Sequence, residues 1–234
     1  MSISALAMSQ VQLEERSFIT KVYGWMAFAL IITGLVAMVT ASSQIMLSIV
    51  FGNRIVFFAL IIAELLLVGY LSAAVRTMSV PAAIVTFILY SALNGLTLSV
   101  IFLVYTRGSI ASTFFITAGT FGAMSIYGYL TKRDLTSMGN LCTMALIGII
   151  IASIVNIFLH SSALYWMSTY IGIIIFVGLT AYDTQKIKNL NIIGNEGTDE
   201  DKKEAIMGAL TLYLDFINLF IMLLRVFGQR RRND

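Results

Sequence analysis

Three acidic side chains stand inside long apolar runs of this 234-residue chain, at Glu64, Asp183 and Asp215. Because a charged side chain at the centre of a bilayer costs about 2.5–3.5 kcal/mol to insert, such acids mark ion pathways, proton relays or polar contacts between helices. Asp215 lies about ten residues into its run, which at about 1.5 Å per residue puts it beyond the reach of snorkelling. Asn218 follows on the same helical face and predicts an inward-facing polar stripe. Asp215 is therefore the strongest candidate for chemistry, with a structural hydrogen bond as the alternative.

Asp183 and Glu64 are each open to two interpretations. Asp183 ends its apolar run, where it is either a functional acid or an interfacial carboxylate that snorkels to water. Glu64 stands near the middle of its run, either as a second-tier candidate or as a satisfied contact between helices. Arg76 ends the same run at the level expected for Asp183, so it is either a salt-bridge partner of Asp183 or a topology charge.

The elements that carry these acids are predicted to be membrane-spanning helices. Hydrophobic residues make up 59% of the chain and charged residues 12%, so the bilayer is its main solvent. The apolar runs are far longer than the roughly 9–11 residues of a barrel strand and lack period-two alternation, so the fold class is all-α. Small residues four apart predict close helix packing at Gly95/Ser99, Ala118/Gly122 and Gly148/Ala152. Seven spans are predicted, at residues 22–40, 55–75, 80–105, 109–130, 138–158, 164–185 and 205–227.

One membrane domain takes up most of the chain. Residues 1–21 are predicted to form a cytoplasmic N-terminal segment, residues 22–227 the seven-helix membrane domain, and residues 228–234 a basic C-terminal tail. Residues 186–204 mix acids with lysines, which indicates a solvated connector, with calcium binding as the alternative. Within it, Thr198 and Asp201 have the spacing of a capping box, so the last helix is expected to begin in this connector.

Lysines and arginines predict the orientation in the membrane. Nine of them lie on the side of the N-terminus, against Arg54 and Arg107 in the loops opposite, so the N-terminus is expected in the cytoplasm. Four arginines nevertheless lie at or beyond the end of the last run, on the opposite side, at Arg225, Arg230, Arg231 and Arg232. The seventh helix therefore either crosses despite this basic end, which we favour, or forms a re-entrant hairpin.

Several classes of function are excluded. One cysteine and one histidine cannot form a disulfide or a four-ligand zinc site. The net charge of +3 does not suggest nucleic-acid binding, and no glycine-rich loop with Lys-Ser/Thr is present to bind ATP. Tyr182 precedes Asp183 and Leu214 precedes Asp215, unlike the Gly-Asp motifs of intramembrane aspartyl proteases. We therefore expect no enzyme and no cofactor, and a lipid bilayer and cations as partners.

Three segments of the chain resemble the transmembrane Bax inhibitor motif family, or Bax inhibitor family. Ala209-Leu-Thr-Leu-Tyr-Leu-Asp-Phe-Ile-Asn-Leu-Phe220, followed by Leu223-Leu-Arg225, is similar to its last-helix signature. Ala181-Tyr-Asp-Thr-Gln185 resembles its sixth-helix signature, and Asn94-Gly-Leu-Thr-Leu98 its third-helix element. The similarity covers roughly residues 16–227.

This resemblance implies a seven-helix bundle with a central last helix in a bacterial inner membrane. It also implies that Asp183 and Asp215 form a proton-sharing pH sensor in a passive calcium leak, with calcium bound in passage and Arg76 as the basic partner. Two carboxyl groups in a poorly solvated site cannot both ionise cheaply, so the pair should titrate as a unit and the leak should close at low pH. The alternative is a membrane interaction protein that conducts no ions and regulates a membrane protease or a stress response.

Overall fold

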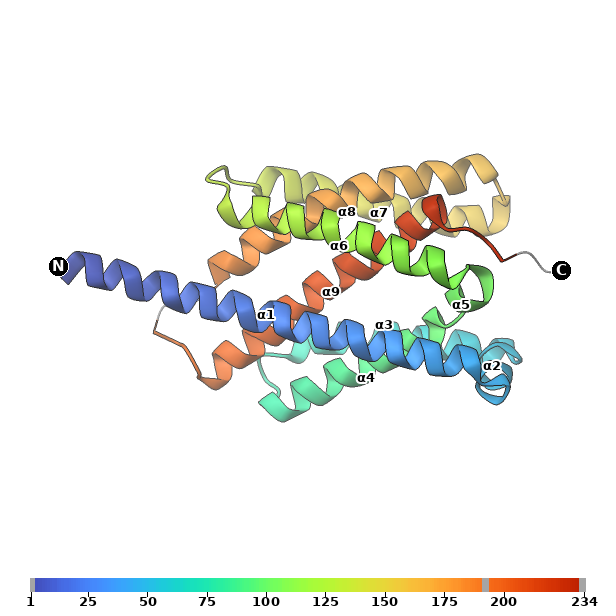
Figure 1. The fold of residues 1–234 in the computed structure, drawn as a ribbon, viewed down its shortest axis with the longest axis horizontal. Coiled ribbons are helices and arrows are strands. Elements are labelled where there is room, and N and C mark those ends of the chain that lie inside the picture. Colours follow the sequence, from blue (N-terminus) through green and yellow to red (C-terminus); the bar gives the residue numbers. More distant parts are fainter. Residues whose placement is uncertain (1–2, 191–193, 232–234) are drawn as a thin grey trace. The chain divides into compact units, whose positions relative to one another are not determined.

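Helices make up the architecture. The computed structural model describes residues 3–190 and 194–231, and these ranges contain no β-strand (Figure 1). Seven of the helices are long and apolar enough to cross a membrane. The predicted all-α fold with seven transmembrane helices is therefore confirmed, whereas the cytoplasmic N-terminus stays a prediction. By their contacts the helices form two units: unit 1 is Met1–Val104 with Leu190–Tyr213, and unit 2 is Tyr105–Asn189 with Leu214–Asp234.

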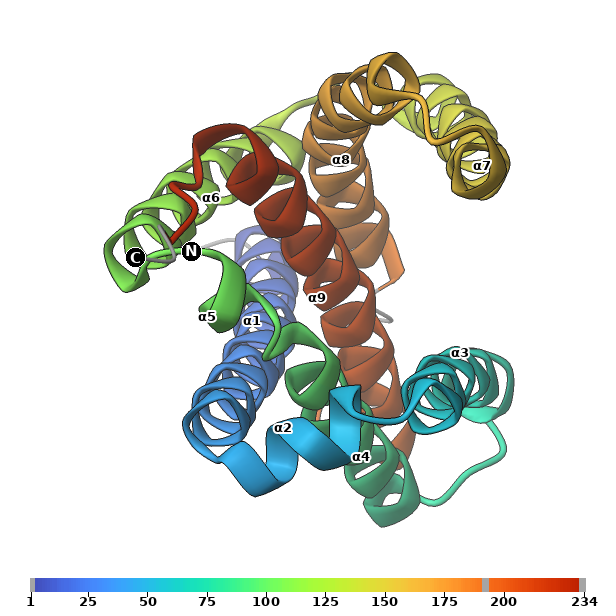
Figure 2. The same cartoon turned by 90° about the vertical axis from the view of Figure 1, so that its right-hand side faces the viewer.

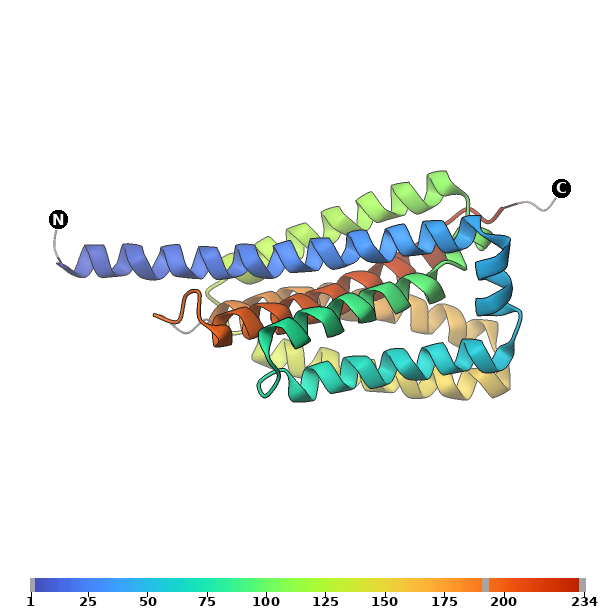
Figure 3. The ribbon, with the colours of Figure 1, turned by 90° about the horizontal axis from the view of Figure 1, so that it is seen from below.

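Unit 1 is built around a layer in which α4 lies between α1 and α3, while the short α2 runs across between the ends of α1 and α3 (Figure 3). Local caps set these helix starts: the Ser43 hydroxyl accepts from the Met46 amide to begin α2, and Asn53 accepts from the Ile55 amide to begin α3. Pro81 stands in the first turn of α4, as expected for a residue without an amide proton. The helices of unit 1 before the last one are α1 (Ile3–Ser42), α2 (Gln44–Phe51), α3 (Arg54–Ala74), α4 (Val80–Leu98) and α5 (Ile101–Val104).

Two spans of the sequence prediction differ from the helices observed. The third span was expected as one helix over residues 80–105, but α4 ends at Leu98 and α5 follows after a short break. The Ser99 amide and hydroxyl both bond to the Leu96 carbonyl three residues back, which tightens the last turn and ends the helix. The first helix begins at Ile3, so the described part of residues 1–21 is helical and continuous with the first span.

In unit 2, α8 lies between α6 and α7 (Figure 2). A buried cluster from α7, α8 and the second half of α9 forms the core, at Ile149, Ile175, Phe176, Leu179, Leu219 and Leu223. The helices that belong wholly or largely to this unit are α6 (Arg107–Leu130), α7 (Thr136–Leu159) and α8 (Ser162–Leu190).

The last helix, α9 (Asp199–Phe227), gives its first half to unit 1 and its second half to unit 2. Its most apolar window is 67% buried, against 39% or less for every other candidate span, which agrees with the predicted central last helix. At 29 residues it is one uninterrupted helix (Figure 1), long enough to cross a hydrocarbon core of about 30 Å. The alternative of a re-entrant hairpin requires a turn that α9 does not contain, so it is wrong for these residues.

The connector between α8 and α9 is shorter than the predicted 186–204. Helix α8 continues to Leu190 and α9 begins at Asp199, after a cap in which the Thr198 hydroxyl accepts from the Asp201 amide at 3.2 Å. The Asp201 carboxylate accepts in return from the Gly197 amide at 2.9 Å, one residue earlier than in a usual capping box. Residues 1–2 of the predicted N-terminal segment, 191–193 of the connector, and 232–234 of the basic tail, Arg232 included, lie outside the described residues.

Two helices carry almost no buried surface. The most apolar windows of α3 and α7 are each 6% buried, and their outward side chains are large and apolar, as at Ile55, Leu66 and Met144. Because exposed apolar faces of this size would be unstable in water, both helices are suited to contact with lipid.

Candidate functional site: the aspartates of α8 and α9

The structure brings Asp183 and Asp215 together within unit 2. Their carboxyl groups are in hydrogen-bond contact, and the side chains come from α8 and from the second half of α9. Asp183 is 9% exposed and Asp215 is 5% exposed. The two acidic residues of the predicted pair therefore meet inside the protein, while their role stays a prediction.

One oxygen of the pair lacks a donor. Asp215 Oδ2 is buried and has no hydrogen-bond partner among the described residues. An ionised carboxylate only accepts, so two ionised groups in contact leave this oxygen unsatisfied. A single proton on either carboxyl group would supply the missing donor, and the arrangement is therefore suited to holding one proton between two acids.

Close helix packing sets the position of Asp183. Gly128 of α6 lies so near α8 that a Cβ atom would meet the Ala181 carbonyl oxygen at 2.1 Å, and a Cβ at Gly139 of α7 would meet the Tyr182 ring at 2.4 Å. Both contacts are made by the residues directly before Asp183. The signature segment around Asp183 is thus held from two sides by glycines that let the backbones approach.

Gln185 fixes the same segment to the connection between α6 and α7. Its amide nitrogen donates to the Arg133 carbonyl at 2.8 Å, and its amide oxygen accepts from the Leu135 amide at 2.9 Å. The Asp183 side chain is buried, which favours an acid directed into the protein over a snorkelling interfacial acid.

In the same connection, Asp134 lies just before the start of α7. Hydrogen bonds from the Thr136 side chain and from the Thr136 amide, the latter at 2.9 Å, hold the pKa of this exposed carboxyl below its usual value. Asp134 is therefore a solvated capping acid with its own donors, unlike the buried pair.

Aromatic packing sets the position of Asp215. The next residue, Phe216, packs edge-on against Phe114 and Phe121 of α6, with ring centroids 5.4 Å apart in both cases. Asn218 is half-buried, and its amide donates to the Leu214 carbonyl of its own helix at 2.8 Å. Asn218 therefore has a partner on its own helix, and the predicted polar stripe from Asp215 to Asn218 stays a prediction.

The basic group that acts on the pair within unit 2 is a lysine. Lys186, one turn after Asp183 on α8, is the cation with an electrostatic effect on the Asp183 carboxyl, and it also lies 5.8 Å from the Tyr182 ring centroid. Residues three apart share a helix face, so the spacing of Asp183 and Lys186 was the signal in the sequence that could have indicated this neighbour.

Arg76 belongs to unit 1. Its carbonyl accepts from Lys203 Nζ at 3.2 Å, and its side chain acts electrostatically on Glu204. The predicted pairing of Arg76 with Asp183 joins residues of different units and stays a prediction.

Glu64 has a donor of its own. In unit 1 the Thr97 hydroxyl of α4 donates to Glu64 Oε1 of α3 at 2.8 Å. This hydrogen bond joins two adjacent helices, so the contact supports the structural interpretation of Glu64.

A calcium ion at the aspartate pair would need many of its oxygen ligands from other groups. The described residues contain no group of three or more His, Cys, Asp or Glu side chains that could hold a metal ion. Calcium takes about six to eight oxygen ligands, whereas two carboxyl groups offer at most four. In the connector, Asp201 is already bound by Lys21 at 2.8 Å, so the alternative of a calcium site there has no support among the described contacts. The aspartate pair therefore suits a cation in passage rather than a resident one.

Comparison with known proteins gives one consistent result. The family described as "Inhibitor of apoptosis-promoting Bax1" matches residues 15–232. The inner membrane protein YbhL of Escherichia coli K12 is 57% identical over 217 residues, which cover 92% of this chain and 93% of that protein. An uncharacterized protein of Borreliella burgdorferi is 47% identical over 220 residues, 94% of each chain. An uncharacterized membrane protein of Streptococcus pyogenes serotype M1 is 38% identical over 219 residues, 93% of each chain.

These matches cover nearly the whole chain and include both aspartate-bearing helices. With the seven apolar helices, they establish that the chain is a multi-pass inner-membrane protein and that it belongs to the Bax inhibitor family.

Proposed function

We propose that this protein is a passive cation leak of the inner membrane, with calcium as the expected permeant ion, and that Asp183 and Asp215 gate it by pH. The observation that carries this proposal is the buried contact of the two carboxyl groups, together with the lack of any donor to Asp215 Oδ2 among the described residues. Such a contact is stable with one shared proton and unstable without it.

The gating step follows from the charge on the pair. With one proton present, the carboxyl groups attract each other and hold α8 against α9 within unit 2. Loss of that proton leaves two like charges in contact in a poorly solvated place, where repulsion is far stronger than in water. The free energy of the closed arrangement therefore rises with pH, and a cation between the carboxylates lowers the free energy of the open one.

The sign of the pH effect is fixed by this scheme. Low pH keeps the proton on the pair and closes the leak, whereas high pH removes it and favours the open state. Because no ATP-binding loop is present in the sequence, flow is expected to follow the ion gradient.

The experiment is calcium and potassium flux through the purified full-length protein in liposomes between about pH 5 and pH 8. Wild-type flux should rise with pH. Asp215→Asn and Asp183→Asn should each flatten the profile, because neither leaves two carboxyl groups to share a proton. Asp134→Asn is the matched control, an identical change at an exposed aspartate of the α6–α7 connection, and it should keep the wild-type profile.

Two results would overturn the proposal. An unchanged pH profile in both aspartate variants would remove the gate. Flux no greater than that of empty vesicles at every pH would remove the leak and favour the alternative, a membrane protein that acts by binding a protease or another membrane partner.

A further inference from the structure

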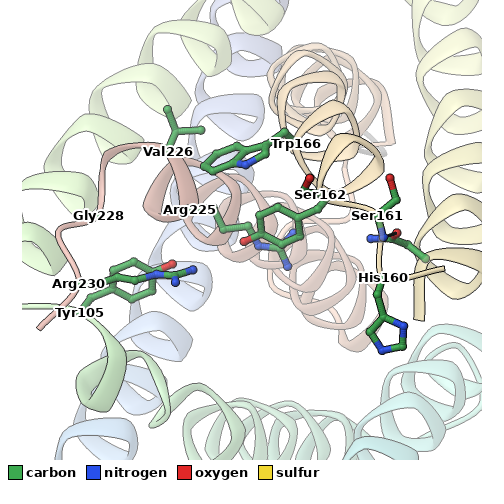
Figure 4. Close-up of a pocket in the computed structure, with 11 residues that line it drawn as sticks. Tyr105, His160, Ser161, Ser162, Trp166, Arg225, Val226, Gly228 and Arg230 are labelled. Atoms are coloured by element: carbon green, nitrogen blue, oxygen red, sulfur yellow. Dashed lines mark hydrogen bonds between the residues drawn. The ribbon is translucent and has the colours of Figure 1, made fainter. Parts of the chain in front are cut away.

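A basic pocket lies in unit 2, apart from the aspartate pair. It is a cavity of about 720 Å³ where the ends of α7 and α9 meet the start of α8, and none of its lining residues is acidic. Two arginines line it, Arg225 from the last turn of α9 and Arg230 from the chain that follows (Figure 4). Neither arginine forms an ion pair with an acid in the described part of the chain. Among the described residues, the cavity therefore concentrates positive charge without an acidic partner.

Contacts position the Arg225 side chain and the Arg230 backbone. The Arg225 guanidinium carbon lies 5.2 Å from the Tyr165 ring centroid, in a cation–π contact. The Arg230 backbone forms an isolated antiparallel β-bridge with that of Tyr105. The neighbouring Gln229 carbonyl accepts from the Thr106 amide at 2.9 Å. Figure 4 shows both arginine side chains directed into the same space. Because the Arg225 guanidinium is positioned before any ligand arrives, less of its entropy is lost on binding.

The turn between α7 and α8 forms the opposite wall. His160 has a left-handed backbone with φ of 50°, a conformation uncommon for residues other than glycine. Asn156 stabilises this turn, since its carbonyl accepts from the His160 amide at 2.9 Å and its side chain accepts from the Ser161 amide at 2.8 Å. The turn thereby aims the start of the 29-residue helix α8 at the cavity, and the partial positive charge of a helix N-terminus adds to that of the arginines.

We propose that this basic pocket binds a phosphate-bearing anion of net negative charge. Arginine presents planar, paired donors that match phosphate oxygens, and an aromatic ring behind the guanidinium leaves those donors free. Lipid is the expected source, because large apolar side chains at the same helix ends are exposed beside the pocket, with Phe158 79% and Phe227 54% exposed. The phosphate would sit in the cavity and the acyl chains along these side chains. This inference is independent of the proposed leak.

Trp166 provides a local readout, because it lines the pocket and Trp25 is the other of only two tryptophans. The experiment follows Trp166 fluorescence in full-length Trp25→Phe protein in detergent. Phosphatidylglycerol, phosphatidylcholine and inorganic phosphate are titrated separately. A saturable change is expected with phosphatidylglycerol and not with phosphatidylcholine, and Arg225→Gln with Arg230→Gln should weaken it by about tenfold or more.

Arg54→Gln with Arg107→Gln is the matched control, since both arginines are exposed and outside the pocket. Arg230→Gln alone, at an exposed position, is the second variant, and it should weaken binding even if the Arg225 change disturbs folding. If inorganic phosphate gives the same arginine-dependent change, the pocket is a phosphate site and its ligand is free phosphate rather than lipid. Equal binding of phosphatidylcholine, or unchanged binding in Arg230→Gln and the double variant, would overturn the proposal.

Discussion

The two units place membrane acids in opposite surroundings. In unit 1, Glu64 accepts a hydrogen bond from the Thr97 hydroxyl on the adjacent helix. In unit 2, Asp215 faces Asp183, and one of its oxygens has no donor unless a proton is shared. The same chemical group is thus satisfied by a hydroxyl in unit 1, whereas in unit 2 it faces another acid, and we propose that only the latter responds to pH. An acid in an apolar run is therefore not by itself a functional site, because its donor decides its behaviour.

The largest effect is expected from a substitution that pushes α8 away from α6 and so separates the two aspartates. In Gly128→Ala, the new Cβ would meet the Ala181 carbonyl oxygen at 2.1 Å, so α8 must move away and Asp183 with it. We expect a loss of about 3 kcal/mol in stability, seen as a lower thermal midpoint in detergent, together with a shallower pH profile of flux. Glu64 and Thr97 lie in unit 1, and their contact should be unaffected.

Gly119→Ala is the control on the same helix, because a Cβ at Gly119 meets nothing within 4 Å. It should leave the flux profile unchanged and keep or slightly raise the thermal midpoint, since alanine favours the helix over glycine. Equal behaviour of the two alanine variants would show that close packing at Gly128 does not hold the pair.

A smaller effect is expected from depriving Glu64 of its donor. Thr97→Val keeps the shape but removes the hydroxyl, which leaves a partly buried carboxyl group unsatisfied and should cost about 1–2 kcal/mol. The thermal midpoint should fall while the pH profile of flux keeps its shape. A flattened profile in Thr97→Val would mean that Glu64 belongs to the pH sensor and would end the contrast between the units.

Lys186 is expected to shift the pH at which the leak opens without removing the pH dependence. In Lys186→Gln, loss of a nearby positive charge disfavours ionised carboxyl groups, so higher pH is needed to open the leak. We expect the midpoint of the flux profile to move up by about half a pH unit, because the lysine is exposed and screened by solvent. The difference between wild type and variant should shrink at high salt. A downward shift would contradict the electrostatic role of Lys186.

The smallest effect is expected at Asn218. Among the described residues, its amide bonds to the Leu214 carbonyl of its own helix, so Asn218→Ala should change stability by less than about 0.5 kcal/mol. The pH profile should match that of the wild type when both are measured in the same liposomes. A shifted profile would extend the responsive region beyond the two aspartates.

The membrane-spanning helices could be predicted from the sequence because the bilayer requires long apolar runs. Each apolar run had to cross the bilayer, and most predicted ends lie within a few residues of the observed ones. The break after Leu98 was missed because the hydroxyl bond that ends α4 there leaves no trace in hydropathy. The early start of α1 was missed because polar residues within a helix resemble a solvated segment.

Contacts between helices were harder to predict than the helices. Gly95 was correctly expected to permit close packing, since a Cβ there would meet the Thr33 carbonyl oxygen at 2.7 Å. The same prediction was wrong at Gly122 and Gly148, where a Cβ would meet nothing within 4 Å. Spacing shows that two small residues share a face, but it does not show which face meets a neighbour.

The most direct test is to observe the shared proton itself. Infrared difference spectroscopy of the purified protein, stepped between acid and alkaline pH, detects the carbonyl stretch of a protonated carboxylic acid. We predict a band from the aspartate pair that persists near neutral pH, disappears in Asp215→Asn, and remains in Asp134→Asn. A spectrum in which Asp215→Asn removes no such band would contradict proton sharing between the two aspartates as the basis of the pH response.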